Sequence, residues 1–501
     1  MLLLSLACVQ DGLDSLDSPA PSPPRTVASR CSDPSAAPGW TDQAEAWQLV
    51  DTLDEDPRRD SGSNTALADL DGDGDDDVLI GLRSGGVSVQ ENLGRGLGSP
   101  QLLGEAVAPA VGLGDMDGDG LLDLLVQGEH GAPELWLNRG GLRFEQASTG
   151  LDGSMIGNGR GLQPGDLDGD GDLDLYVYTS LHDWLLERTS SGFEDASSRI
   201  GLDQGWADKS WVAAWTDLDR DGAPELYVSN DLQAEYGPSR LYWNRAGELE
   251  RDDGGCACES TTYSMGMSVG DVDGNGYQDL LIGSTQSLGL YTNQGDGSFV
   301  DVSAAWGLNS LLGWDQMSLG TLLEDLDLDG DLDLFLAGGR FGEGPVLENQ
   351  TLDQPDLILW NEAGSFRRDE RLTDPQDARG VSSGDVNGDG WPDLLVGNVE
   401  APSRLWLSDC TDERVSLTVE LSDGAGNRFG QGAQVELETA EGVQVREVTV
   451  NRGLFGSQHP RAVFGLAADE EVLALRVRWP WTSEAIEVDL DELAPVMLVE
   501  R

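Results

Sequence analysis

Short runs of hydrophobic residues alternate with acidic, glycine-rich segments over most of the chain. From about residue 46 to 410 the same order of segments returns at intervals of about 50 residues. One unit contains the runs AVGLG (110–114), LLVQG (124–128), PELWLN (133–138) and LRFEQ (142–146). Runs this short, rich in branched and aromatic residues and bounded by Gly, Asn and Asp, are typical of β-strands. Four short strands per unit predict the blades of a β-propeller.

The unit occurs seven times, so the sequence predicts an all-β protein whose seven-bladed propeller spans residues 44–410. Beyond that point the repeat stops, and short alternating strands continue without any helical pattern. Residues 411–501 therefore predict a second, β-sandwich-like domain.

The seventh unit ends at its third strand, Arg404–Leu407, and lacks a fourth. An unassigned stretch, AEAWQLVDTLDE at Ala44–Glu55, precedes the first unit. We expect this stretch to supply the missing strand and to close the ring. Closure would remove an open sheet edge, which otherwise favours aggregation.

Each unit carries one nine-residue acidic loop between its first and second strands. The loops are DLDGDGDDD (69–77), DMDGDGLLD (115–123), DLDGDGDLD (166–174), DLDRDGAPE (217–225), DVDGNGYQD (271–279), DLDLDGDLD (325–333) and DVNGDGWPD (385–393). Carboxylate or amide oxygens stand at positions 1, 3, 5 and 9, and Gly stands at position 6, in every copy. Oxygen ligands at this spacing, with a Gly that permits a sharp turn, suit Ca²⁺.

We predict up to seven calcium ions, held by positions 1, 3, 5 and 9 and by the position-7 carbonyl. The candidate ligands are Asp69, Asp71, Asp73, Asp75, Asp77, Asp115, Asp117, Asp119, Leu121, Asp123, Asp166, Asp168, Asp170, Asp172, Asp174, Asp217, Asp219, Asp221, Ala223, Glu225, Asp271, Asp273, Asn275, Tyr277, Asp279, Asp325, Asp327, Asp329, Asp331, Asp333, Asp385, Asn387, Asp389, Trp391 and Asp393. The fourth, fifth and seventh loops depart from the all-Asp pattern and are expected to bind less tightly. An EF-hand needs Glu at position 12, where these loops have only Ile, Val or Leu, so the EF-hand is excluded.

The formal net charge is −62. This charge argues against nucleic acid and anionic membrane surfaces as partners, because both attract clusters of Lys and Arg. Cysteine usage favours an oxidising compartment. Ring closure would bring Cys31 near Cys410, and Cys256 and Cys258 are expected to pair with each other.

The first eight residues, MLLLSLAC, resemble the end of a bacterial lipoprotein signal peptide with Cys8 as the lipidated residue. The run is shorter than usual and lacks a charged start. Residues 9–43 are rich in Ser and Pro and predict an extended linker. We therefore expect an exported protein, either an outer-membrane or cell-surface lipoprotein or a secreted one, which meets the membrane only through a lipid anchor.

The repeats resemble FG-GAP/VCBS repeats, the family that includes the propeller of integrin α-chains. The C-terminal part resembles the ASPIC/UnbV domain through Gly426-Asn427-Arg428, Arg452-Gly453, Ser457-Gln458 and Val477–Pro480. The combination is similar to the cartilage acidic protein group. This resemblance implies an exported, calcium-binding scaffold for adhesion or for interaction with a protein or glycan, and we expect a monomer.

Catalytic chemistry has little support in the sequence. The three histidines, His130, His182 and His459, are scattered along the chain and give no evident nucleophile–base pair. We therefore predict no catalytic residues and no enzyme activity. The alternative is a carbohydrate-active enzyme or a biosynthetic accessory protein that uses a propeller face. In a glycosidase, Asp183, Glu187 or Asp315 could supply the acids.

Overall fold

The computed structural model describes residues 25–32, 34–35, 39–51, 64–107, 110–151, 159–202, 210–230, 238–256, 258, 264–284, 287–312, 316–339, 354–369, 371–372, 374–399, 401–424, 426–450, 453, 455–491 and 493–501. Strands dominate these residues, and the short helical segments among them are α2 (Leu308–Leu311) and a 3₁₀ turn at Ser197–Ile200. The predicted all-β class is confirmed.

The described residues before 411 contribute four strands to each of seven antiparallel sheets. In chain order they are β2 (Asn64–Ala68), β3 (Asp77–Gly81), β4 (Val87–Gln90) and β5 (Gln101–Leu103); β6 (Ala110–Gly114), β7 (Asp123–Gln127), β8 (Glu134–Asn138) and β9 (Phe144–Ala147); β10 (Gly159–Gly165), β11 (Asp174–Thr179), β12 (Trp184–Thr189) and β13 (Gly192–Asp195); β14 (Ser210–Thr216), β15 (Glu225–Asn230), β16 (Arg240–Arg245) and β17 (Glu248–Arg251); β18 (Ser264–Gly270), β19 (Asp279–Ser284), β20 (Leu288–Asn293) and β21 (Phe299–Asp301); β22 (Ser318–Glu324), β23 (Asp333–Gly338), β24 (Leu357–Asn361) and β25 (Phe366–Arg368); and β26 (Ala378–Gly384), β27 (Asp393–Asn398) and β28 (Arg404–Ser408), with β1 (Trp40–Asp42) as the fourth strand.

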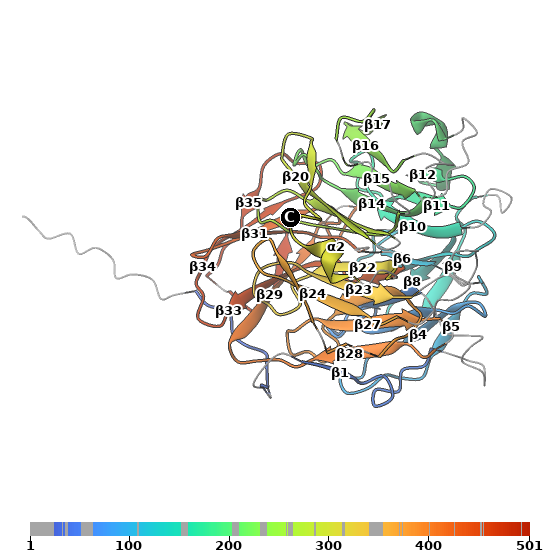
Figure 1. Ribbon diagram of the computed structural model, residues 1–501. Helices are drawn as coiled ribbons and strands as arrows, with labels where there is room; N and C mark the ends of the chain where they lie inside the picture. The colour runs from blue at the N-terminus through green and yellow to red at the C-terminus, as the bar shows by residue number, and fades with distance from the viewer. Residues whose placement is uncertain are drawn as a thin grey trace, which may run out of the picture.

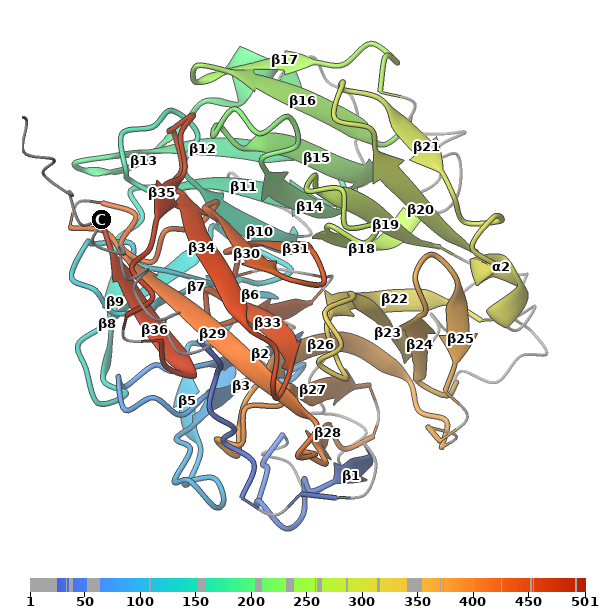
Figure 2. The same ribbon diagram turned by 90° about the vertical axis from the view of Figure 1, so that its left-hand side faces the viewer.

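The first strand of each sheet packs against the first strand of the next, in the order β2, β6, β10, β14, β18, β22 and β26. Strand β26 then packs against β2, so the sheets form a closed, propeller-like ring, seen from the side in Figure 1 and along its axis in Figure 2. These first strands are buried because the core lies between neighbouring sheets; Leu67 on β2, Leu113 on β6 and Leu319 on β22 have no exposed surface.

The strand that completes the last sheet differs from the predicted one. Trp40–Asp42 pairs antiparallel with β28, whereas the described residues of the predicted stretch, 44–51, do not. Residues 44–48 form turns instead, with Gln48 at a φ of 61°, and Trp47 packs into the core between the last and first sheets. Residues 52–55 lie outside the described residues. The chain before the first repeat therefore closes the ring, but with an earlier and shorter strand.

The C-terminal part forms two facing sheets. One contains β33 (Arg461–Ala467), β29 (Arg414–Ser422) and β36 (Val496–Glu500), and the other contains β31 (Val443–Glu447), β30 (Gln434–Thr439), β34 (Val472–Arg478) and β35 (Ile486–Glu487). Their facing side chains, including Leu417, Phe464 and Leu475, form one buried core. Figure 2 shows this domain lying across one face of the ring.

A three-residue strand of the C-terminal part leaves its own sheets and joins the ring. Strand β32 (Gly456–Gln458) pairs in parallel with β2, so the first sheet has five strands. The Ser457 hydroxyl donates to the Val111 carbonyl of the second sheet at 2.7 Å. A Cβ atom at Gly456 would lie 1.8 Å from the Val381 carbonyl of the seventh sheet, so only glycine fits there. This segment therefore lies among the innermost strands.

The described part of the predicted linker is packed against both domains. Val27 is buried in the core of the C-terminal domain, and the Arg30 guanidinium lies 2.9 Å from the Asp385 carboxylate. Cys31 is bonded to Cys410, the pairing that ring closure predicts. Cys8 lies outside the described residues. Among the helices that the structure describes, none has both the length and the hydropathy to cross a membrane.

Candidate metal centres

Each acidic loop follows the innermost strand of its sheet and folds around its own carboxylates. In the first loop, the Asp69 carboxylate accepts hydrogen bonds from the backbone N–H groups of Gly72 (2.7 Å) and Gly74 (3.0 Å). Gly74 occupies position 6 with a φ of 96°, and the six glycines at the equivalent positions are also left-handed. The turn that the glycine permits therefore curls the chain back over the position-1 carboxylate.

Position 9 fixes the loop to the sheet in the same way in all seven copies. One carboxylate oxygen of Asp77 accepts the N–H of Leu70, at position 2 of the loop (3.0 Å). The other accepts the N–H of Asn92, which follows the third strand of the sheet in the chain (2.8 Å). The equivalent pairs of hydrogen bonds are made by Asp123, Asp174, Glu225, Asp279, Asp333 and Asp393.

The loops bring three carboxylates together. The first, third and ninth positions meet in at least four of the loops that the structure describes, with ligand atoms within 4.8 Å of one another. These triads are Asp69–Asp71–Asp77, Asp115–Asp117–Asp123, Asp166–Asp168–Asp174 and Asp271–Asp273–Asp279; in the fourth loop the triad is Asp217, Asp219 and Asp221. Three carboxylates this close repel each other unless a cation or protons lie between them.

The buried position-9 carboxylates show this tension most clearly. Burial raises the pKa of Asp77 to about 7, although hydrogen bonds from Asn92 and Leu70 lower it in part. Burial also raises the pKa of Asp174 to about 8 and that of Glu225 to about 9. Neighbouring loop carboxylates raise these pKa values further. These buried surroundings therefore favour either protonation of the loop carboxylates or a cation bound between them.

The donor set fits a hard cation, because every candidate side-chain ligand is an oxygen and the third and fifth positions lie toward solvent. At position 5, one side-chain oxygen accepts the N–H of position 7 in each loop, as Asp73 does from Asp75 (3.0 Å). This bond ties the backbone of position 7 to the side chain of position 5. Positions 1, 3 and 9 thus converge in the first, second, third and fifth loops, and positions 1, 3 and 5 converge in the fourth, while the ligand role of every position stays a prediction.

The C-terminal domain covers the face of the ring that carries the loops. Three loops accept hydrogen bonds from this domain: the Trp481 indole N–H donates to the Asp166 carbonyl (3.3 Å), the Trp481 backbone N–H to the Gly222 carbonyl (2.7 Å), and the Gly465 N–H to the Asp325 carboxylate (3.1 Å). In the first loop, Arg461 forms an ion pair with Asp76. In the three other loops, Arg428 lies beside Gly120, Val445 beside Gly276 and Ser416 beside Gly390. Every loop therefore contacts the second domain.

Asparagines at the end of the third strands join neighbouring blades, a role that the sequence reasoning missed. The Asn293 side-chain amide donates to the Leu218 carbonyl of the preceding loop (2.8 Å) and to the Gln278 carbonyl of its own loop (3.2 Å). Asn92, Asn138, Asn244 and Asn361 make the same pair of contacts. In the third blade Arg188 takes this place and donates to the Met116 carbonyl. The signal was visible as the Asn that ends PELWLN, SRLYWN, LGLYTN and LILWN.

Other residues singled out from the sequence have structural surroundings. Asp183 is buried and accepts hydrogen bonds from the Tyr176 hydroxyl (2.9 Å) and the Thr179 N–H (2.7 Å), while Glu187 pairs with Arg199. Asp315 lies outside the described residues. His459 is buried against Phe429, and burial lowers its pKa to about 4.

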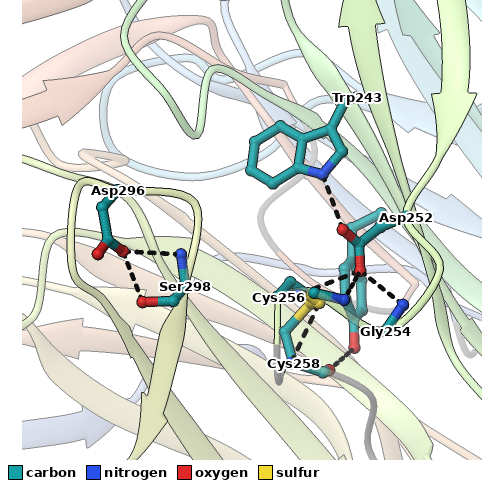
Figure 3. The surroundings of a disulfide bond; sticks show 9 residues. Trp243, Asp252, Gly254, Cys256, Cys258, Asp296 and Ser298 are labelled. Carbon is teal, nitrogen blue, oxygen red and sulfur yellow. Dashed lines mark hydrogen bonds between the residues drawn. A yellow bond between two sulfur atoms is a disulfide. The ribbon is translucent and has the colours of Figure 1, made fainter.

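Cys256 and Cys258 are bonded to each other in the fourth blade (Figure 3). The Asp252 carboxylate accepts the N–H groups of Gly254, Gly255 and Cys256 at 2.7–3.1 Å, and the Tyr227 hydroxyl donates to the Cys258 carbonyl (2.8 Å). These bonds hold the disulfide against the core of its blade.

Comparison with known proteins finds relatives in both sequence and structure. Cartilage acidic protein 1 of Xenopus tropicalis is 24% identical over 459 residues, covering 74% of this chain and 70% of that protein. The mouse (Mus musculus) protein of the same name is 24% identical over 457 residues, with 74% and 70% coverage. The solved structure of an Agrocybe aegerita lectin that recognises non-reducing terminal N-acetylglucosamine has a TM-score of 0.42 and 19% identity, covering 68% of this chain and 86% of that one. The lectin similarity supports no statement about what this chain binds.

Two family models match the sequence. The ASPIC and UnbV model matches residues 423–490, which contain most of the C-terminal domain. The FG-GAP-like repeat model matches residues 69–126, 115–177, 217–282, 271–336 and 325–396. Each span begins at one acidic loop and ends in the strand that directly follows the next matched loop. These spans cover more than half of the 501 residues. The chain therefore belongs to the FG-GAP-like repeat family, with an ASPIC/UnbV domain at its C-terminal end.

Proposed function

We propose that this protein is an exported calcium-binding scaffold that presents its surfaces to a protein or glycan partner, and that calcium has a structural role in it. The observation that carries the proposal is the repeated convergence of carboxylates in the loops, on the face of the ring where the second domain lies. Calcium suits these loops because it accepts six to eight oxygen ligands at flexible angles. Bound calcium would supply positive charge between acids that otherwise repel one another.

Calcium in the loops would also hold the two domains together. The C-terminal domain contacts loop backbone groups whose positions depend on how the loop is folded, as where Trp481 donates to Gly222 and Arg478 donates to the Arg220 carbonyl (2.8 Å). A loop that opens through carboxylate repulsion would lose such contacts. We therefore expect calcium to stabilise the ring and the attached domain as one unit.

The expected size of the effect follows from mass action. Calcium modules outside the cell bind with Kd of roughly 0.1–1 mM. At ~5 mM calcium and a Kd of ~0.5 mM, each occupied loop adds about 1.4 kcal/mol to the free energy of unfolding. Seven independent loops of that affinity would add roughly 10 kcal/mol, which is comparable to the whole stability of an ordinary domain.

The test compares thermal unfolding of the full chain in calcium and in EGTA, with the number of bound ions measured by equilibrium dialysis. Two acids that contact the same arginine provide a matched pair. Asp117 and Glu145 lie 2.7 Å and 3.3 Å from the Arg139 guanidinium, and of the two only Asp117 belongs to a carboxylate triad. Asp117→Ala should therefore lose one bound ion and part of the calcium-induced rise in Tm, while Glu145→Ala should retain both. A Tm that is the same in calcium and EGTA would refute the structural role.

The proposed export has its own test. Two disulfides in the described residues favour folding in an oxidising compartment, and the sequence around Cys8 resembles a lipidation site. Mass spectrometry of the mature N-terminus from the native host should find a lipid on Cys8, and Cys8→Ser should release the protein from membranes. An unmodified mature protein in the medium would instead support plain secretion.

The proposed partner class can be tested with a glycan array and a hydrolysis assay on the same glycans, both with calcium present. A scaffold should bind without turnover. Hydrolysis by the purified, calcium-loaded protein would overturn the scaffold proposal in favour of an enzyme.

A further inference from the structure

The C-terminal domain leaves two strand edges open on the same side. Strand β36 is the last strand of the three-stranded sheet and pairs in parallel only with β29. Strand β35 is the last strand of the facing sheet and pairs only with β34. Figure 2 shows β35 and β36 on the side of the domain where the chain ends. Because each is the final strand of its sheet, one edge of its backbone has no strand partner among the described residues.

A hollow of about 490 Å³ lies between these two strands, and we call it the edge groove. Its floor consists of Val488, Met497 and Val499, which pack partly against the core of the domain. Its margins expose apolar side chains: Ile486 is 49% and Leu498 is 60% exposed. The open gap between the sheets is therefore incompletely covered by the domain's own side chains.

Strand β36 exposes apolar side chains, which is unusual for the edge strand of a sheet. The side chains of Val496, Leu498 and Glu500 are the exposed set of β36, while Met497 and Val499 face the core. A solvent-facing set on an edge strand is normally polar, often lysine, because such residues prevent pairing with another chain. Strand β36 has no lysine, arginine or proline, so it lacks those protections.

The polar part of the groove is acidic. Glu487, Asp489 and Glu500 line it, and the chain as a whole carries a net charge of −62. A second copy of this chain would bring the same acids to the same margin, so like charges oppose that occupant. Positive charges beside an apolar stripe would instead complement it.

We propose that the edge groove binds an extended segment of another protein, in which apolar residues alternate with basic ones. The segment adds to β36 as a new strand, so its backbone bonds to the free edge. Its apolar side chains enter the gap above Val488 and Met497, and its basic side chains lie beside the groove carboxylates. This is the strand-addition mode of peptide recognition. The inference rests on the proposed scaffold function, and it names the chemistry of the partner.

The experiment uses the full, calcium-loaded chain and a fluorescent peptide of about ten residues in which valine and lysine alternate. A control peptide has the same number of lysines but replaces every second valine with proline, which cannot donate a backbone hydrogen bond. Binding is measured by fluorescence anisotropy at ~150 mM salt, where long-range attraction is screened. Hydrogen–deuterium exchange of Val496–Glu500 is measured on the unsubstituted protein with and without peptide.

We expect the valine–lysine peptide to bind, the proline peptide to bind much more weakly, and exchange at β36 to slow when the first peptide is present. Leu498→Lys should weaken binding by about tenfold, because it removes a central apolar contact and adds a repelling charge. Leu473→Lys is the matched control, since Leu473 is 48% exposed in the same domain but does not line the groove. It should leave binding unchanged.

Equal binding of both peptides would show charge attraction alone and would overturn the proposal. Unchanged exchange at β36 would do the same, as would an equal loss of binding in Leu473→Lys. If sedimentation instead shows a dimer that Leu498→Lys dissociates, and the peptide does not bind, a second copy is the occupant and the proposal is wrong. The rise in Tm that calcium causes is measured on the same samples and tests the scaffold proposal independently. If that rise is present and the peptide does not bind, the groove proposal alone has failed.

Discussion

The contact between Asn293 and the preceding loop offers a direct test of how the blades are held together. Asn293 is 1% exposed, and its amide nitrogen donates to the Leu218 and Gln278 carbonyls. Its side-chain oxygen accepts the Gly295 N–H at 2.9 Å. Asn293→Ala removes these three bonds but keeps the backbone bond from its N–H to Asp279. The substitution therefore removes the blade-to-blade contact, while the backbone anchor to position 9 of its own loop stays in place.

The expected loss follows from those three bonds. A typical hydrogen bond contributes about 1 kcal/mol net, and a buried group left without a partner costs roughly 1–3 kcal/mol. Water can reach the exposed side of the loop, so the cost lies toward the lower end of that range. We expect Asn293→Ala to lower the free energy of unfolding by about 3 kcal/mol. Asn293→Asp should cost more, because it places a carboxylate oxygen against two carbonyl oxygens and beside the loop acids.

Urea denaturation at saturating calcium measures this difference. Gln294→Ala is the matched control, because among the described residues the Gln294 side chain bonds only to Thr292, in the strand that precedes it. Hydrogen exchange should also become faster in the loop that contains Leu218, in the blade before the substitution, and it should not change there in Gln294→Ala. A loss in Asn293→Ala that is no greater than that of Gln294→Ala would refute the idea that this asparagine joins the blades.

Two further predictions concern ring closure and protonation. The Cys31–Cys410 bond spans 379 residues, for which loop-closure entropy sets a ceiling of about 6 kcal/mol, so Cys31→Ser with Cys410→Ser should cost roughly 2–5 kcal/mol in urea. Replacing Cys256 and Cys258, which are separated by 2 positions, should cost less, and the reverse order would contradict this account. In EGTA, Asp77 and Asp174 have folded pKa values of about 7 and about 8, above the ordinary value of 3.8, so the folded state binds more protons and its Tm should fall between pH 5 and pH 8. In calcium the Tm should instead rise as the pH increases from 5 to 8, because calcium binds only deprotonated carboxylates. If the Tm also rose with pH in EGTA, the predicted burial of these acids would be wrong.

The sequence was sufficient for features that depend on neighbouring residues. Strand runs such as LLIGS and the loop at Asp271–Asp279 were placed correctly because hydrophobic runs, glycine turns and carboxylate spacing act within about ten residues. The convergence of Asp271, Asp273 and Asp279 follows from the same local geometry. The family resemblance extended this reasoning to the second domain, and the comparisons confirmed it.

Features set by distant contacts were not predictable in the same way. Trp40–Asp42 and Ala44–Glu55 both contain Trp, and the choice between them is made by packing, because Trp47 fits the core between the last and first blades. Asn293 meets Leu218 across 75 positions, and Gly465 meets Asp325 across 140. The recurring Asn at the end of the third strand marks one member of such a pair, but no local pattern identifies its distant partner, so neither the joining of blades nor the covering of the loops was predicted.

Strand β32 has a consequence for how the protein is made. It pairs with β2, so the innermost position of the first blade to be synthesised is completed by residues 456–458. Until those residues emerge from the ribosome or the export channel, the first blade has an unfilled place beside Thr65–Leu67. Blades that fold early must therefore wait, as partly finished intermediates, for the last tenth of the chain. A premature stop after the seventh blade would yield a ring without this axial strand, and we expect that product to depend on chaperones and to be degraded rather than to accumulate as a smaller working protein.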